Sequence, residues 1–173
     1  VEESELSDAF WAFTLPAALE TTSTISPFFQ TFLAAQVSRN SRGFLSKGIT
    51  VAAMTQQSGD IHHIVPKHYL QNNGFPDRGD YNQVANFALT ETSINISISN
   101  RPPVKYMAEV ATQIESGVLK LGEITDAGDL AANLAENAIP FELAEVTAGN
   151  YKEFLVRRRE RMAAIIRDYY QTL

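Results

Sequence analysis

Two adjacent histidines, His62 and His63, and two asparagines further along the chain, Asn86 and Asn95, are the residues best suited to carry a reaction. Neutral imidazole can act as a general base or as a metal ligand, and its pKa of about 6.5 suits both tasks. An asparagine offers a neutral oxygen ligand. Hydrolysis of a phosphodiester with one metal needs a base for the attacking water and ligands for a divalent ion on the scissile phosphate. The two histidines and Asn95 could divide these tasks between them.

Each candidate also has a structural interpretation, and the residues alone leave both open. A histidine such as His62 can be an ordinary strand residue, Asn86 can serve only to brace a loop, and Asn95 can cap the helix that follows it. Asp60 lies two positions before His62, so it would share its side of a strand and orient a ligand, or else be a solvated turn residue. Lys67 would contact either phosphate or solvent.

Short strands must position these residues. Asp60 to Val65 is rich in β-prone residues and is stopped by Pro66, and Asn86 to Thr90 predicts a second strand. The segment 71–80 between them contains Asn, Gly, Pro and Asp, which is typical of a loop.

Helices are predicted on both sides of the strands. One covers 27–35, with Ser26 as N-cap and Pro27 at the first helical position, and others cover 105–119, 126–138 and 150–173. The last helix has a broad apolar stripe that we expect to lie against the core, with its cluster of arginines, Arg157, Arg158, Arg159 and Arg161, turned outward. Together these elements predict an α+β fold that is mainly helical.

The net charge of −6 conceals two basic segments. The overall acidity argues at first against nucleic acid, because phosphate binding relies on clustered cations. However, residues 39–105 carry seven basic and four acidic residues, and residues 151–173 carry six and three. We therefore expect weak DNA binding that is supplemented by a partner domain. The absence of cysteine excludes disulfides and thiolate metal sites, and no apolar run approaches the about 20 residues of a membrane span.

Three sequence blocks resemble the motif of HNH nucleases, which have a ββα-metal core. The blocks are DIHHIVPK at 60–67, YNQVANF at 81–87 and TSINISI at 92–98, and RPPVKY at 101–106 matches the block that follows. The version of the motif is similar to the C-terminal nuclease modules of GmrSD-type restriction and phage-defence proteins. The resemblance implies one nuclease domain over 1–173, with an N-terminal helical segment at 1–50, the HNH core at 55–106 and C-terminal helices at 107–173.

The resemblance also implies a role for each matching residue. His63 would be the general base, and Asn86 would brace the loop so that His63 points at the scissile phosphate. His62 and Asn95, the latter at the start of the α element, would hold the metal. The ion would be Mg²⁺ or Mn²⁺, with Ni²⁺ or Zn²⁺ left open by the nitrogen ligand.

Two cations, Lys67 and Arg101, are candidates for binding phosphate oxygens of DNA. The chain departs from its relatives at Asn95-Ile96-Ser97-Ile98, where they usually carry a basic residue and this sequence has none. A catalytically inactive HNH scaffold that binds nucleic acid or protein is therefore the alternative to an active nuclease.

The expected setting is a DNA endonuclease of a restriction or antiviral defence system in the prokaryotic cytoplasm. The resemblance implies an N-terminal ParB-like nucleotide-hydrolysing domain in the full-length protein, which would choose the target, and no membrane. The sequence leaves open whether the substrate is DNA or RNA, modified or plain, and whether the chain forms a homodimer to cut both strands.

Overall fold

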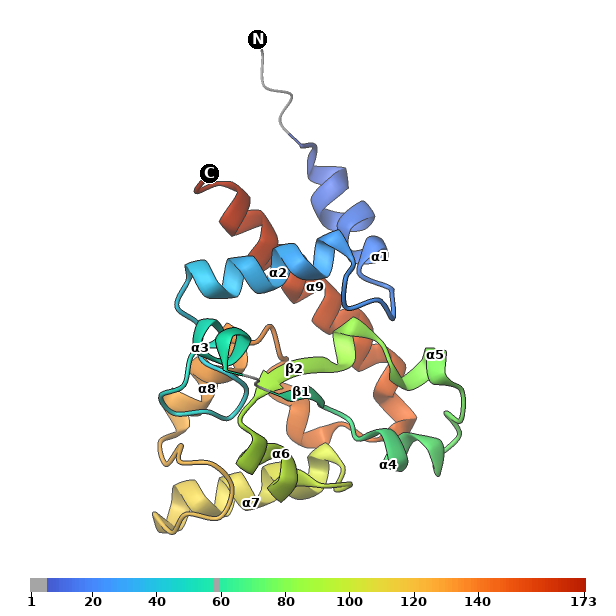
Figure 1. Ribbon diagram of the computed structural model, residues 1–173. Coiled ribbons are helices and arrows are strands. Elements are labelled where there is room, and N and C mark those ends of the chain that lie inside the picture. Colours follow the sequence, from blue (N-terminus) through green and yellow to red (C-terminus); the bar gives the residue numbers. More distant parts are fainter. Residues whose placement is uncertain (1–5, 58–59) are drawn as a thin grey trace.

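The computed structural model describes residues 6–57 and 60–173 and shows helices arranged around one small antiparallel sheet (Figure 1). Strands β1 (Asp60–His63) and β2 (Phe87–Thr90) pair with Asp60 opposite Thr90 and His63 opposite Phe87. Helix α6 (Thr92–Ile98) follows β2 and lies against β1. This confirms the predicted α+β class and both predicted strands.

The remaining elements fall into three groups along the chain. Before the sheet come η1 (Phe10–Thr14), α1 (Leu15–Ala18), α2 (Pro27–Ser38) and α3 (Val51–Gln56). Between the strands lie α4 (Lys67–Gln71), α5 (Arg78–Tyr81) and η2 (Val84–Asn86). After α6 come α7 (Pro103–Ser116), α8 (Ala127–Glu136), η3 (Phe141–Glu145), η4 (Ala148–Asn150) and α9 (Tyr151–Tyr170).

Local signals explain where the longer helices begin and end. Helix α2 has Pro27 at its first position, and α7 stops at Gly117, whose φ of 71° is left-handed. The side chain of Asp126 caps α8 by accepting from the backbone N–H of Asp129. All three helices are confirmed, but with other bounds: α2 extends past the predicted residue 35, α7 begins two residues before the predicted 105 and ends before 119, and α8 is shorter than the predicted 126–138. The loop predicted at 71–80 is wrong at both ends, because α4 extends to Gln71 and α5 begins at Arg78.

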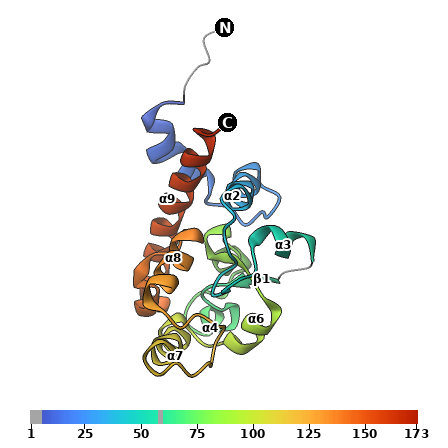
Figure 2. The same cartoon turned by 90° about the vertical axis from the view of Figure 1, so that its left-hand side faces the viewer.

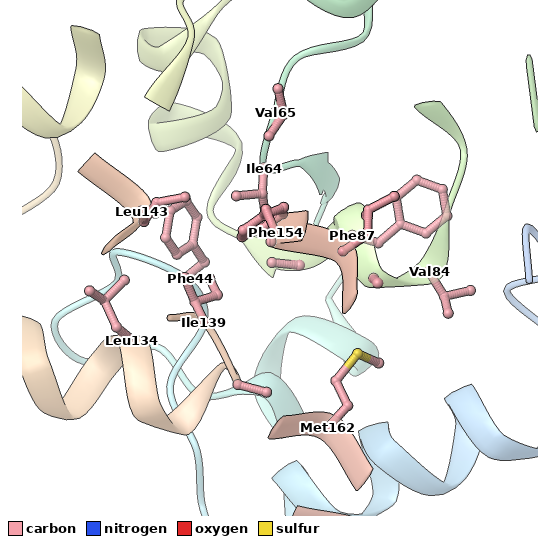
Figure 3. Packing of buried hydrophobic residues seen from close by; sticks show 14 of the residues in the cluster. Phe44, Ile64, Val65, Val84, Phe87, Leu134, Ile139, Leu143, Phe154 and Met162 are labelled. Atoms are coloured by element: carbon pink, nitrogen blue, oxygen red, sulfur yellow. The ribbon is translucent and has the colours of Figure 1, made fainter. Parts of the chain in front are cut away.

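Helix α9 has 20 residues, and it packs against α1, α2 and η2 rather than broadly over the sheet (Figure 2). At its C-terminal end Tyr170 lies 5.3 Å from the Trp11 ring, measured between ring centroids, and Leu15 and Leu19 are buried, so residues 10–19 belong to the packed structure, while residues 1–5 lie outside the described ranges. Figure 3 shows the centre of the core, where Phe44, Ile64 and Phe154 meet. Among the helices of 6–57 and 60–173, none combines the length and the apolar character needed to cross a membrane.

The expectation that the arginines of α9 all face outward is wrong for Arg158. Its side chain is buried, and its guanidinium donates to the carbonyls of Ala85 at 2.8 Å and Asn137 at 3.2 Å. Burial lowers its pKa to about 9, so it still carries its charge at neutral pH. Arg157, one residue earlier, is exposed and paired with Glu153. Arg158 thus fixes the η2 turn, which leads directly into β2.

Candidate functional site

The two histidines lie at the end of β1 and face opposite sides of the strand, as adjacent strand residues must. His62 and Asp60 share the side that is covered by α6. His63 shares the other side with Phe87, its partner across the sheet, at 5.1 Å between ring centroids. The structure therefore builds two separate clusters on neighbouring residues.

The first cluster is a chain of hydrogen bonds that joins β1 to α6. Nδ1 of His62 lies 2.8 Å from Oδ1 of Asn95, and Nδ2 of Asn95 donates to Oδ2 of Asp60 at 3.3 Å. A carboxylate can only accept a hydrogen bond, so the NH₂ group of Asn95 faces Asp60. The amide oxygen of Asn95 then faces His62. Asp60 thus orients the side chain of Asn95. From the sequence alone, Asp60 could also have been a solvated turn residue.

Asn95 does not cap a helix. It is the fourth residue of α6, and Glu91 occupies the N-cap position. Both the capping alternative and the expected place at the start of the α element are therefore wrong. Ile94 and Ile98 are buried and fix the rotation of the helix, which brings Asn95 to the face that meets β1.

His62 is almost fully buried, with 3% of its surface exposed, and its ring stacks on Phe44 at 5.9 Å between centroids. Burial lowers its pKa to about 4, so the imidazole is neutral at physiological pH. Its second nitrogen, Nε2, is buried and has no hydrogen-bond partner among residues 6–57 and 60–173. A buried polar atom without a partner is costly, and a bound ion is one of the partners that can satisfy it.

The donor set fits a divalent ion with few protein ligands. In the structure the 2.8 Å contact between Nδ1 of His62 and Oδ1 of Asn95 is a hydrogen bond, which an ion would have to replace. Metal–ligand distances of roughly 2.0–2.2 Å place neighbouring ligands of an octahedral ion about 3 Å apart, so the two atoms already have the spacing of such a pair. His62 is also in the neutral form that a metal requires. Within the described ranges no group of three His, Asp or Glu side chains is arranged around a metal. An ion here would thus take its other ligands from water and substrate.

The second cluster surrounds His63. Nε2 of His63 lies 2.8 Å from Oδ1 of Asn82, which follows α5, and Tyr81 lies 6.2 Å from His63 between ring centroids. Burial lowers the pKa of His63, and the nearby charge of Lys67 acts in the same direction. His63 is therefore neutral at physiological pH, which is the form that a general base needs.

Asn86 braces the backbone on both sides of this cluster and does not touch His63. It is fully buried, accepts from the backbone N–H of Val65 at 2.9 Å, and donates to the carbonyls of Val65 at 3.0 Å and Tyr81 at 3.1 Å. Its own backbone carbonyl accepts from Ile64 at 2.8 Å. The segment after His63 is thereby tied to the segment before Asn82.

The two expected phosphate-binding cations have different surroundings. Lys67 is exposed, and its ammonium lies 5.3 Å from the centroid of the Tyr81 ring, beside His63. Arg101 is engaged with Glu109 and with the backbone carbonyls of Ser97 and Ile98 at the end of α6. Lys67 is therefore placed to meet a phosphate near the histidines, whereas Arg101 secures α6.

The structure thus brings Asp60, His62 and Asn95 together and sets His63 one residue away. Asn82 is the member of the site that the sequence interpretation missed. Its signal was its position within the block at 81–87, four residues before Asn86, but a hydrogen bond to His63 could be recognised only once the turn was folded.

Comparison of the chain with protein-family models, with curated proteins and with solved structures found no match in any of the three. A function for the chain is therefore inferred from the chemistry of the two clusters and from their place on β1, β2 and α6.

Proposed function

We propose that the chain is a metal-dependent endonuclease module of the HNH type, which hydrolyses DNA phosphodiester bonds. The observation that carries the proposal is the direct contact of His62 with Asn95 at 2.8 Å, next to a second, separately held histidine. A purely structural histidine at position 62 would need neither a buried Nε2 without a partner among the described residues nor an Asn95 amide that a carboxylate orients toward Nδ1.

The residues divide the work as follows. His63 accepts a proton from the attacking water, because it is neutral and only half-buried. Lys67 attracts a phosphate oxygen from its exposed position next to His63. A divalent ion held by His62 and Asn95 would supply Lewis-acid stabilisation of the charge that develops on the phosphate. In the same proposal a nucleotide-hydrolysing domain of the full-length protein selects the target.

One observation favours the alternative of an inactive scaffold. Arg101 is paired with Glu109 and with helix carbonyls, so it is not free to bind a phosphate. An inactive scaffold would bind DNA or a protein without cleaving a phosphodiester bond.

Incubation with supercoiled plasmid separates the two functions. The wild-type chain is tested with Mg²⁺ or Mn²⁺, with and without EDTA, beside His63→Ala and His68→Ala. His68 is exposed on α4 and makes a matched control for loss of a histidine. The nuclease predicts metal-dependent nicking that His63→Ala abolishes and His68→Ala retains.

Two results would overturn the nuclease. One is the absence of cleavage with every metal tested, and the other is cleavage that His63→Ala leaves unchanged. Plasmid retardation without cleavage would instead support the scaffold.

A further inference from the structure

We infer that Asn82 is the positioning residue of the catalytic base, fixing which nitrogen of His63 is free to take a proton. The inference rests on the proposed nuclease function for its consequence in catalysis. Its structural content, the state of the His63 ring, can be measured without any reaction.

The hydrogen bond itself decides the tautomer. Oδ1 of Asn82 is an acceptor, and it lies 2.8 Å from Nε2 of His63. A neutral imidazole that meets an acceptor at Nε2 carries its proton there and has its lone pair on Nδ1. Nδ1 makes no hydrogen bond with the residues of 6–57 and 60–173. The nitrogen with the lone pair is thus the one that Asn82 leaves open.

The ring is also fixed by its neighbours. The edge of His63 stands against the face of Phe87, with an angle of 87° between the ring planes, and Tyr81 flanks it at 58°. Rotation of the imidazole by half a turn would break the bond to Asn82. The contact therefore selects one ring orientation in addition to one tautomer.

Both partners of the bond are held on a common frame. Asn82 ends α5, where its backbone N–H donates to the carbonyl of Arg78 at 3.1 Å. The side chain of Asn86 binds Val65, two residues after His63, and Tyr81, one residue before Asn82. The buried amide of Asn86 thus connects the segment that carries His63 with the segment that carries Asn82.

An amide suits this task better than a carboxylate would. It accepts the hydrogen bond from Nε2 without placing a negative charge against the imidazole ring.

The first test is the tautomer, observed in the full chain by long-range ¹H–¹⁵N correlation spectra of ¹⁵N-histidine-labelled protein in EDTA. His63→Gln assigns the signals of His63. We expect protonated Nε2 and unprotonated Nδ1 in the wild type, and a mixture of tautomers in Asn82→Leu and Asn82→Ala. Asn72→Leu, the same change at an exposed position, should leave the spectrum as in the wild type.

The second test is the rate of plasmid cleavage. Asn82→Leu and Asn82→Ala should lower kcat by about 100-fold with little change in KM, because a misdirected base affects the chemical step. Asn82→Asp keeps an oxygen acceptor and should retain activity within about tenfold of the wild type. Circular dichroism melting of each variant distinguishes a local loss from unfolding.

The results also separate this inference from the proposed function. A wild-type His63 with its proton on Nδ1, or an unchanged kcat in folded Asn82→Leu, would overturn the role of Asn82. If the wild type cleaves nothing but Asn82→Leu still scrambles the tautomer, the positioning role stands and the nuclease is rejected.

Discussion

His62 Nδ1 and Asn95 Oδ1 face each other at 2.8 Å, although 33 residues separate them in the chain. The contact joins the first strand to the helix after the second strand, with Asp60 holding the amide from behind. Other contacts already hold both residues in place. The Phe44 ring stacks on His62, and the buried Ile94 and Ile98 anchor α6, which carries Asn95. In the proposed function this pair would hold the divalent ion.

Loss of either member of this pair should weaken metal binding. We expect His62→Ala and Asn95→Ala each to weaken Mn²⁺ affinity by at least about tenfold, because each removes one of two protein ligands. The double variant should bind Mn²⁺ about as weakly as the more affected single variant, because the two ligands act as a unit. Isothermal titration calorimetry measures the affinities, with His68→Ala as the control. Unchanged Mn²⁺ binding in His62→Ala would contradict this assignment.

Burial of neutral His62 should make the metal-free protein less stable in acid. Its pKa is about 4 when folded and about 6.5 when unfolded, so between these values the unfolded chain binds more protons. The free energy of unfolding therefore falls as pH is lowered through this range, by up to about 3 kcal/mol from this residue. Urea unfolding in EDTA at several pH values gives the slope.

The matched variant for this prediction is His62→Gln, which is neutral at every pH in the range. Its free energy of unfolding should vary less with pH than that of the wild type, and His68→Gln, the same change at an exposed position, serves as the control. Parallel curves for the wild type and His62→Gln would show that His62 titrates normally in the fold.

Asn86 should matter more to stability than any exposed asparagine. Asn86→Ala leaves the buried N–H of Val65 and two carbonyls without their partner, which should cost about 3 kcal/mol in the free energy of unfolding. Urea denaturation measures the loss, and Asn72→Ala, at an exposed position, serves as the control. A loss below about 1 kcal/mol would mean that water or backbone shifts replace these bonds.

Local sequence signals predicted much of the secondary structure. Pro27, Gly117 and Asp126 mark helix ends through their own backbone geometry or short side chains, so these boundaries are written in a few neighbouring residues. The two strands were recognised in the same way. Helices η1 and α1 were missed, although the hydroxyl of Ser7 accepts from the backbone N–H of Phe10 where they begin.

The site depended on contacts between distant segments, and these were only partly predictable. The blocks at 60–67 and 92–98 indicated His62 and Asn95, but their facing atoms depend on how α6 rotates on its buried isoleucines. Asn82 and Arg158 carry no local mark of their roles. Each is defined by a partner across a turn, His63 in one case and the η2 carbonyls in the other.

The buried arginine of α9 should respond to substitution quite differently from its exposed neighbour. Arg158→Met removes the donors to Ala85 and Asn137 and should lower the free energy of unfolding by about 2–4 kcal/mol. Arg157→Met breaks an exposed pair with Glu153 and should change it by less than about 1 kcal/mol. Thermal and urea unfolding compare the two. Equal losses would refute the distinction between them.

The two cations of the site should likewise separate into one that binds substrate and one that supports the fold. Lys67→Ala should reduce kcat/KM for plasmid by about tenfold and lower the slope of log affinity against log salt by about 1, because it removes one phosphate contact. Arg101→Ala should keep that slope and instead lower the melting temperature, because its guanidinium binds Glu109 and the end of α6. Lys105→Ala, which changes an exposed lysine on α7, controls for loss of charge alone. A smaller salt slope in Arg101→Ala together with an unchanged slope in Lys67→Ala would contradict this division of roles.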